Sequence, residues 1–237
     1  MSKYKDVDMI EKKTARLYRE KWEFNKGNRI FIKDGIKLKE VTSIKGCSIS
    51  FLGFNSVIVI EEGAKIAKCT IFVGEGAFIQ FGRNFTVRFN LTLDARAKNS
   101  TIVFGNNCNI GTASIYSGDE PNLEIIVGND FLAALDLMLR NSDGHTICDQ
   151  ETRRIINQPQ FGIHIGNHVW CGYNVSILKD AEIPDNCVVA ACAVVGKKKF
   201  FENSIIAGIP AKVVKRNIVW HSCQIDRYVQ LNPDCLF

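Results

Sequence analysis

The chain of 237 residues is long enough for one large domain or two small ones. It carries 30 Lys and Arg against 25 Asp and Glu, and the two signs are mixed along most of its length. This balance argues against nucleic acid as a main partner. No apolar stretch approaches the ~20 residues of a transmembrane segment, and residues 1–23 lack the apolar core of a signal peptide. We therefore expect a cytoplasmic protein.

The nine cysteines are an odd number, and no two of them are spaced as Cys-x-x-Cys. This usage argues against both a disulfide framework and a zinc knuckle. We expect reduced thiols and no metal.

Residues 1–27 are richly charged and predict an N-terminal arm or cap, with a short helix over 10–22 as one form of it. From residue 28 onward, short runs of β-branched residues alternate with Gly and Asn. Each run predicts a strand closed by a turn, at residues 30–32, 57–60, 70–73 and 101–104.

An apolar residue stands at every sixth position in the second half of the chain: Ile165, Cys171, Ile177, Ile183, Val189 and Val195. This period fits neither a helix nor a long strand, and it indicates a solenoid of short strands. The same step links Phe81, Val87 and Leu93, and then Phe104, Ile110 and Tyr116. With three faces per turn, residues 30–195 would stack roughly eight or nine coils before insertions are subtracted. Matching corners fall at Gly82, Gly105, Gly128 and Gly166, where we expect positive φ.

Two segments interrupt the period. Residues 141–161 have few inward-type residues and predict a loop that protrudes from the coil, and residues 197–203 form a basic loop. The expected organisation is a coil domain over residues 28–215, with the excursion 141–161, followed by a C-terminal cap over 216–237.

Two motifs resemble those of the hexapeptide-repeat acetyltransferases. Ile165-Gly166-Asn167-His168-Val169-Trp170-Cys171-Gly172 is similar to their I-G-x-x-V-W-I-G, and Ile206-Ala207-Gly208-Ile209-Pro210-Ala211-Lys212 to their closing A-G-N-P-A-K. The string Ser142-Asp143-Gly144-His145-Thr146-Ile147 resembles the sialic acid and capsular polysaccharide O-acetyltransferases within that superfamily.

The resemblance implies an all-β fold, the left-handed parallel β-helix, assembled as a homotrimer with acetyl-CoA between subunits. It implies that His145 is the general base and that Trp170 lies beside it. The residues expected along the cofactor are Cys171, Gly172, Ala191, Lys197, Lys198, Pro210 and Lys215. The acceptor would be a sugar of a bacterial surface polysaccharide, sialic acid being one candidate.

The residues themselves are compatible with this chemistry. His145 follows Gly144 in a flexible segment, and Asp143 or Asp149 is close enough in sequence to orient its imidazole. An imidazole that accepts the hydroxyl proton would act as a general base at neutral pH. Trp170 precedes an inward residue, so its side chain should point outward, where it needs a partner.

Acceptor specificity would reside around Tyr116, Arg140, Asn141 and the rest of the excursion. His164 and His168 should lie on different parts of one turn, which disfavours a metal pair and a γ-type carbonic anhydrase. Two other functions stay open: N-acetylation of an amino sugar nucleotide, and a non-catalytic trimeric scaffold.

Overall fold

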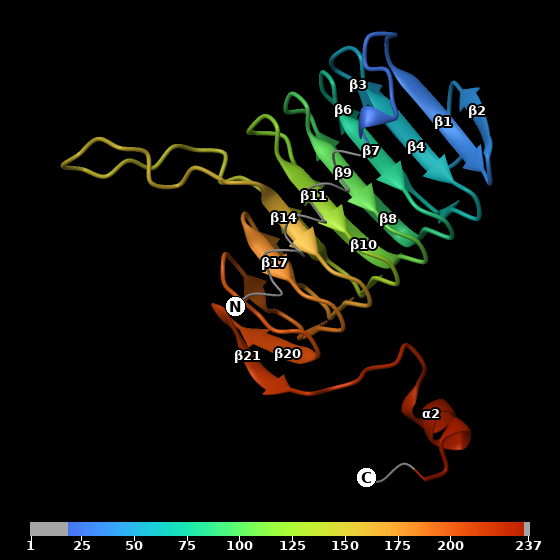
Figure 1. Cartoon of the computed structure of the whole chain (residues 1–237), viewed down its shortest axis with the longest axis vertical. Coiled ribbons are helices and arrows are strands. Elements are labelled where there is room, and N and C mark those ends of the chain that lie inside the picture. The colour runs from blue at the N-terminus through green and yellow to red at the C-terminus, as the bar shows by residue number, and fades with distance from the viewer. Residues whose placement is uncertain (1–18, 235–237) are drawn as a thin grey trace.

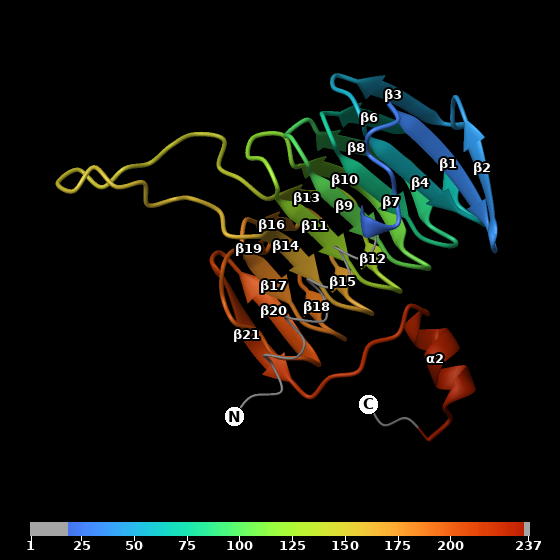
Figure 2. The ribbon, with the colours of Figure 1, turned by 45° about the horizontal axis from the view of Figure 1, so that its top comes forward.

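Short parallel strands stack one above the other along the long axis of the molecule (Figure 1). The computed structural model describes residues 19–234. Each turn of the chain adds one level to three faces, so the described part is a parallel β-helix. The expected strands at 30–32, 57–60, 70–73 and 101–104 are all present. The longest interruption is the excursion after residue 140, which projects sideways from the stack (Figures 1 and 2).

The first face is a single eight-stranded sheet in which only β2 runs antiparallel. Its strands, in spatial order, are β2 (Lys37–Val41), β1 (Arg29–Asp34), β4 (Val57–Glu61), β7 (Phe78–Phe81), β9 (Thr101–Phe104), β11 (Glu124–Val127), β14 (Gly162–Ile165) and β17 (Ala181–Ile183).

The second and third faces are joined, because β8 (Thr86–Ala95) and β10 (Asn109–Tyr116) bend around the corner between them. The second face further contains β5 (Lys65–Ile66), β12 (Leu132–Ala133), β15 (Trp170–Cys171), β18 (Val188–Val189), β20 (Ser204–Gly208) and β21 (Ala211–Arg216). The third face further contains β3 (Cys47–Phe51), β6 (Cys69–Val73), β13 (Leu137–Arg140), β16 (Ser176–Leu178) and β19 (Val194–Val195).

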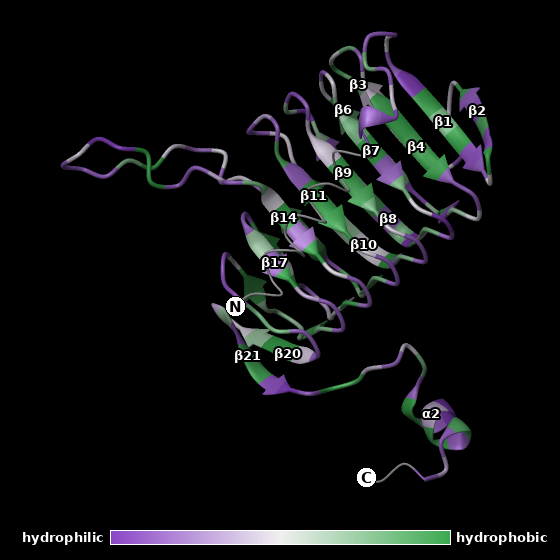
Figure 3. Cartoon of the chain, in the orientation of Figure 1, coloured by the Kyte–Doolittle hydropathy of each residue, from purple (hydrophilic) through white to green (hydrophobic). Residues whose placement is uncertain are grey.

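The core is the column of side chains that point into the coil. All six residues of the sequence ladder are buried, from Ile165 to Val195, so the predicted period is confirmed. Apolar residues cover the strands and polar residues gather at the turns (Figure 3). Burying this column removes apolar surface from water at every level, and this stabilises the stack.

Coil length changes along the stack, and this explains why the sequence period is regular only near the end. Asn107 and Asp130 occupy the same corner on successive levels and are 23 residues apart. His168 and Asn186, at the same corner further on, are 18 apart, which is three repeats of six. Because the early coils are longer and the excursion 141–161 adds no level, the first face stacks seven parallel strands, β1 to β17, compared with the eight or nine coils expected before insertions are subtracted.

The expected step from Ile110 to Tyr116 is wrong. The inward residues that follow Ile110 are Ala113 and Ile115, which are buried and pair with Leu91 and Leu93 on the preceding level. Between Ile110 and Thr112 the pairing register shifts, so this corner takes one residue fewer than the corner in β8. Tyr116 consequently points outward.

The predicted positive φ at the corner glycines is also wrong. Positive φ falls two residues later, as at Asn84, Asn107 and Asp130, residue types that tolerate it through local hydrogen bonds. Gly82 is required for a different reason: a Cβ there would lie 2.4 Å from the carbonyl O of Gly105 on the next level. The absence of a side chain lets adjacent coils approach.

Amide side chains connect these corners from level to level. The Nδ2 of Asn84 donates to Asn107 Oδ1, and the Nδ2 of Asn107 donates to Asp130 Oδ1, both at 3.0 Å. His168 has positive φ in the same column, and its Nδ1 lies 3.1 Å from Asn186 Oδ1. This histidine therefore serves as a corner residue.

Both ends of the stack finish in an antiparallel pair, β1 with β2 and β20 with β21. Before β1, Trp22 packs on Phe31 across the outside of the first face, with ring centroids 4.8 Å apart. Most of the helix expected over 10–22 lies outside the described residues. After β21 the chain runs along the side of the stack to α2 (Ile225–Leu231), which buries none of its side chains. Within residues 19–234 no helix has the length and apolarity to cross a membrane.

Candidate active site

The excursion 141–161 leaves the coil between the third and first faces and returns to the same corner (Figure 1). Its two limbs run side by side, since the N–H of Ile156 donates to the carbonyl O of Ile147 at 2.9 Å and Cys148 bridges to Ile155. At its tip, the side chain of Thr152 donates to Asp149 Oδ1 at 2.8 Å. The predicted off-period segment is therefore an ordered two-limbed arm.

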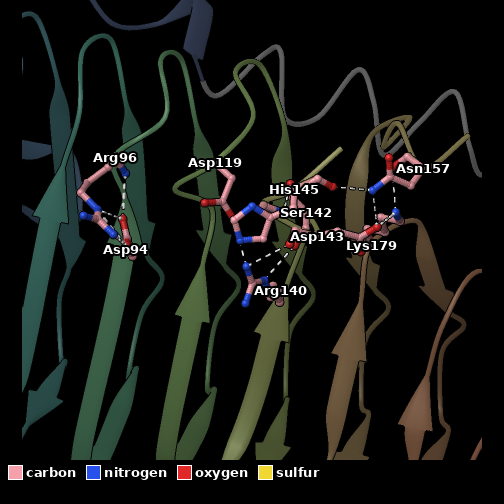
Figure 4. A network of polar contacts seen from close by, with 10 residues as sticks. Asp94, Arg96, Asp119, Arg140, Ser142, Asp143, His145, Asn157 and Lys179 are labelled. Atoms are coloured by element: carbon pink, nitrogen blue, oxygen red, sulfur yellow. Dashed lines mark hydrogen bonds and ion pairs between the residues drawn. The ribbon is translucent and has the colours of Figure 1, made fainter. Parts of the chain in front are cut away.

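His145 is exposed near the base of this arm. Its carbonyl O accepts a hydrogen bond of 2.8 Å from Asn157 Nδ2 on the returning limb (Figure 4). The imidazole makes no hydrogen bond with residues 19–234, so within this part of the chain the ring is held only through its backbone. An accessible imidazole on a fixed backbone is a candidate proton acceptor.

The two carboxylates expected to orient His145 have other partners. Asp143 forms an ion pair with Lys179 and accepts a hydrogen bond of 2.9 Å from Asn157 Nδ2. The contact with Lys179, and then that with Asn157, holds the pKa of the Asp143 carboxyl below its usual range. Asp149 is engaged by Thr152 at the tip. Asp143 thus fixes the arm rather than the imidazole.

Arg140, expected to bind the acceptor, also holds the arm. At the end of β13 its Nε donates to the carbonyl O of Ser142 at 2.8 Å, and its Nη2 donates to that of Asp143 at 3.3 Å and to Asp119 Oδ2 at 3.4 Å (Figure 4). A Cβ on Gly144 would lie 2.8 Å from Arg140 Nη2, and Gly144 has a φ of +75°, so both conditions favour glycine here.

The other two acceptor candidates differ in access. Tyr116 pairs with Arg140 on the next level, and its side chain points outward, so it remains accessible. Asn141 is only 1% exposed, and its Nδ2 donates to Ser117 Oγ at 2.8 Å inside the corner. An acceptor sugar does not reach a side chain at that depth.

Trp170 points outward from the second face, as expected, and is 40% exposed. Its ring partner is Trp220 of the C-terminal segment, with centroids 5.9 Å apart. Trp170 belongs to β15, which pairs with β12 and β18, whereas His145 follows β13 on the third face. Within one chain Trp170 therefore lies on the second face, whereas His145 lies in the arm at the corner between the third and first faces.

The expected cofactor residues fall at two edges of the coil. Gly172 and Ala191 lie at successive levels of the corner between the second and third faces, where a Cβ on Gly172 would be 2.8 Å from the Ala191 nitrogen. Pro210 is exposed in the turn between β20 and β21, and Lys215 is exposed on β21. Lys197 and Lys198 are exposed after β19, where the chain leaves the third face.

Cys171 does not fit the cofactor role. Its side chain is fully buried in the coil, and this burial raises the pKa of the thiol. Cys171 is a core residue that acts as a small hydrophobe, and it is the neighbouring Gly172 that borders the surface.

The histidine pair of the repeat motif is separated as the period predicts. His164 lies on β14 and points out from the first face, where its Nε2 is 2.7 Å from Glu124 Oε1. His168 lies in the following corner. Within residues 19–234 no three His, Cys, Asp or Glu side chains gather as metal ligands would.

Three contributors escaped the sequence analysis: Asn157, Lys179 and Trp220. Asn157 joins the two limbs of the arm, and Lys179 reaches Asp143 from the next level of the coil. A corner position was the only signal for Lys179, and no local motif marks the other two. Their contacts depend on folding that brings distant segments together.

No protein-family model matches the chain. A polysialic acid O-acetyltransferase of Neisseria meningitidis is 30% identical over 198 residues, which cover 80% of this chain and 86% of that protein. A polysialic acid O-acetyltransferase of Escherichia coli O1:K1 / APEC is 35% identical over 123 residues, 52% of this chain, and the match spans only 39% of that relative.

Among solved structures, the polySia specific acetyltransferase NeuO superposes with a TM-score of 0.67 at 24% identity, over 86% of this chain and 88% of that one. This likeness confirms the left-handed parallel β-helix. The chain belongs to the polysialic acid O-acetyltransferases, a family of hexapeptide-repeat acetyltransferases. It is an O-acetyltransferase by this membership.

Proposed function

We propose that the protein transfers the acetyl group of acetyl-CoA to a hydroxyl of a sialic acid-containing surface polysaccharide, with His145 as general base. The observation that carries the proposal is the exposed imidazole of His145 on a backbone fixed at the base of the arm. The names of the two relatives support the acceptor, because both are polysialic acid O-acetyltransferases.

The reaction is a direct transfer in a ternary complex. His145 accepts the proton of the acceptor hydroxyl while its oxygen attacks the thioester carbonyl carbon. The carbon–sulfur bond then breaks, and the departing thiolate of CoA takes the proton back from the imidazolium. General base catalysis of this kind contributes about 10²- to 10⁴-fold in rate. The step needs no metal.

The positions of His145 and Trp170 support a site shared between subunits. Since Trp170 lies on the second face and His145 in the arm at the corner between the other two faces, we propose that a site containing both draws them from different chains. The cofactor residues divide in the same way, with Gly172 and Ala191 at one edge and Lys197 near another. We propose a homotrimer with three such sites.

The cofactor groove would combine small and basic residues. Gly172 and Ala191 leave room for the pantetheine arm, and Lys197 and Lys198 would meet the phosphates of CoA. The Gly172 N–H does not serve as the oxyanion donor, because it donates to the carbonyl O of Val189 at 2.8 Å. Use of acetyl-CoA also supports a cytoplasmic location, where this donor is made.

The accessible side chains beside the arm are suited to an acidic sugar. Tyr116 and Arg140 lie on adjacent levels of the third face, and the guanidinium of Arg140 is partly exposed. The Nη1 of Arg140, which takes no part in the contacts that hold the arm, would donate to a sugar carboxylate. We therefore retain these two residues as acceptor contacts.

Release of free thiol from acetyl-CoA tests the activity. We expect release with an α-linked oligomer of sialic acid and little with a neutral oligosaccharide. His145→Ala should reduce turnover by at least ~10²-fold. His221→Ala is the matched control, because this exposed histidine packs on Tyr228 in the C-terminal segment. If His145→Ala keeps a turnover close to that of His221→Ala, the role of His145 as general base is refuted. If no acceptor causes thiol release, the protein is a non-catalytic scaffold.

Mixed assemblies test the shared site. Chains carrying His145→Ala and chains carrying Trp170→Ala are each expected to be inactive alone. Coexpressed, they form trimers in which some sites receive intact copies of both residues, so partial activity should return. If verified mixed trimers stay inactive, both residues of a site come from the same chain. This outcome would contradict the proposal.

A further inference from the structure

We propose that Asn157 is a positioning residue for His145, holding the imidazole at the base of the arm where the acceptor hydroxyl arrives. The inference rests on the proposed role of His145 as the base. Asn157 lies on the returning limb, 12 residues further along the chain than the histidine. It acts through hydrogen bonds to the outgoing limb.

The side chain of Asn157 contacts three alternate residues of that limb. Its Nδ2 donates to Asp143 Oδ2 at 2.9 Å and to the His145 carbonyl O at 2.8 Å. Its Oδ1 accepts the N–H of Ile147 at 2.8 Å. Both amide protons and the carbonyl are therefore in use, and His145 is the middle residue of the clamped segment (Figure 4).

Lys179 ties this clamp to the rigid coil. It follows β16 on the next level, and its Nζ forms an ion pair with Asp143 and donates to the Asn157 carbonyl O at 2.7 Å. The Lys179 side chain is 21% exposed, so it is better shielded than the carboxylate it meets, at 41%. One lysine thus holds both limbs against the stack.

Arg140 does not replace this clamp. It holds the carbonyls of Ser142 and Asp143, both before His145, and it reaches neither the histidine nor the returning limb. Between them stands Gly144, whose positive φ marks a backbone with wide conformational freedom. Without Asn157, the two limbs would be joined only further out, at Ile147 and Cys148, and His145 would lose its own tie to the returning limb.

Placement of a base matters more than its mere presence. A displacement of ~1 Å costs on the order of 10² in rate, because the proton must be within hydrogen-bond reach in the transition state. Loss of Asn157 should therefore act on kcat. The cofactor residues lie on other levels of the coil, so the KM for acetyl-CoA should not change.

The test uses Asn157→Asp in the full-length enzyme. The variant has nearly the same shape and can still accept the Ile147 N–H, but it cannot donate to Asp143 or to His145. We expect kcat to fall about 10- to 100-fold, with the KM for acetyl-CoA within about twofold. Hydrogen exchange of residues 143–147 should speed up while the coil keeps its protection.

Thr152→Ala is the matched control on the same arm. It removes a side-chain hydrogen bond to Asp149 at the tip and touches nothing near His145. We expect kcat and exchange at 143–147 as in the wild type. Lys179→Met provides an independent variant, since it frees the clamp from the coil without altering Asn157, and its kcat should fall in the same range.

Introducing Asn157→Asp into the His145→Ala variant distinguishes a loss of kcat that acts through His145 from a loss that does not. If Asn157 acts through His145, adding Asn157→Asp should not lower the residual turnover further. The same drop in both backgrounds, or a kcat for Asn157→Asp that equals the Thr152→Ala value, would overturn the positioning role. Full turnover in His145→Ala alone would instead refute the proposed base, so the two failures are distinguishable.

Discussion

Trp220 lies flat against His168, with ring centroids 4.0 Å apart and planes 7° from parallel. Its indole N–H also donates to the His168 carbonyl O at 3.0 Å. One side chain of the C-terminal segment thus covers a corner of the coil and borders Trp170. Because α2 buries no side chain of its own, this contact is the main attachment of residues 217–231 among those described.

Trp220→Ala should release the C-terminal segment while leaving the coil folded. Limited proteolysis should cut between residues 217 and 231 much faster than in the wild type, because local opening there would cost little free energy. The coil's melting temperature should change by no more than roughly 4 °C. Val219→Ala, at a neighbouring side chain that is 78% exposed, should leave the cleavage rate unchanged. Equal cleavage of both variants would contradict the attachment.

Gly128→Ala should destabilise the coil by about 1–3 kcal/mol. A Cβ there would lie 2.6 Å from the carbonyl carbon of Gly166, so the two levels would have to separate. Urea unfolding followed by circular dichroism measures the change. Gly196→Ala is the control, since nothing lies within 4 Å of its Cβ position. A free energy of unfolding for Gly128→Ala equal to that of the control would show that the corner does not need glycine.

The ion pair of Asp143 with Lys179 should persist across the neutral range and fail only in acid. The pKa of Asp143 is lowered in the folded protein, chiefly by Lys179. Its contribution is therefore complete above the unfolded value of about 3.9 and is lost as the pH falls through the lower folded value. Exchange protection of residues 143–147 should be constant from about pH 5 to 8 and drop below about pH 4. Asp143→Asn should show no such acid step.

Lys197→Glu should weaken acetyl-CoA binding selectively. Replacing a phosphate contact by a negative charge should raise the KM for acetyl-CoA about tenfold, the effect of losing ~1.5 kcal/mol. The KM for the acceptor should change little. Lys39→Glu on β2, at the opposite end of the stack, controls for net charge. Equal effects of Lys197→Glu on both substrates would refute its place in the cofactor groove.

The inward ladder could be read from the sequence because each of its residues must be apolar and six positions apart. The arm was visible for the opposite reason, since residues 141–161 break that period. The contacts between distant segments could not be predicted: Asp143 and Lys179 are 36 residues apart, and Trp220 and His168 are 52 apart. Such contacts depend on the number of residues in each coil, and this number changes from 23 to 18 along the stack.

The sequence period predicted the burial of individual residues only where the coil is regular. Cys171 fits the motif position of a cofactor residue, yet the inward period already assigned its side chain to the core, and the structure agrees with the period. Asn141 begins the arm in sequence, but its side chain turns back into the corner toward Ser117. Spacing gives the direction of a side chain within a regular coil, and it loses that power at the first residue of an interruption.

The antiparallel strands at the two ends have a consequence for solubility. A parallel coil leaves open backbone edges onto which another copy could stack, and repetition of that contact would produce a fibre. Here β2 reverses direction at one end and exposes Lys37 and Lys39, and β21 reverses at the other and exposes Lys212 and Lys215. On these two faces the terminal edge therefore runs against the direction of the stack and carries exposed lysines, and this disfavours the addition of another copy in parallel register.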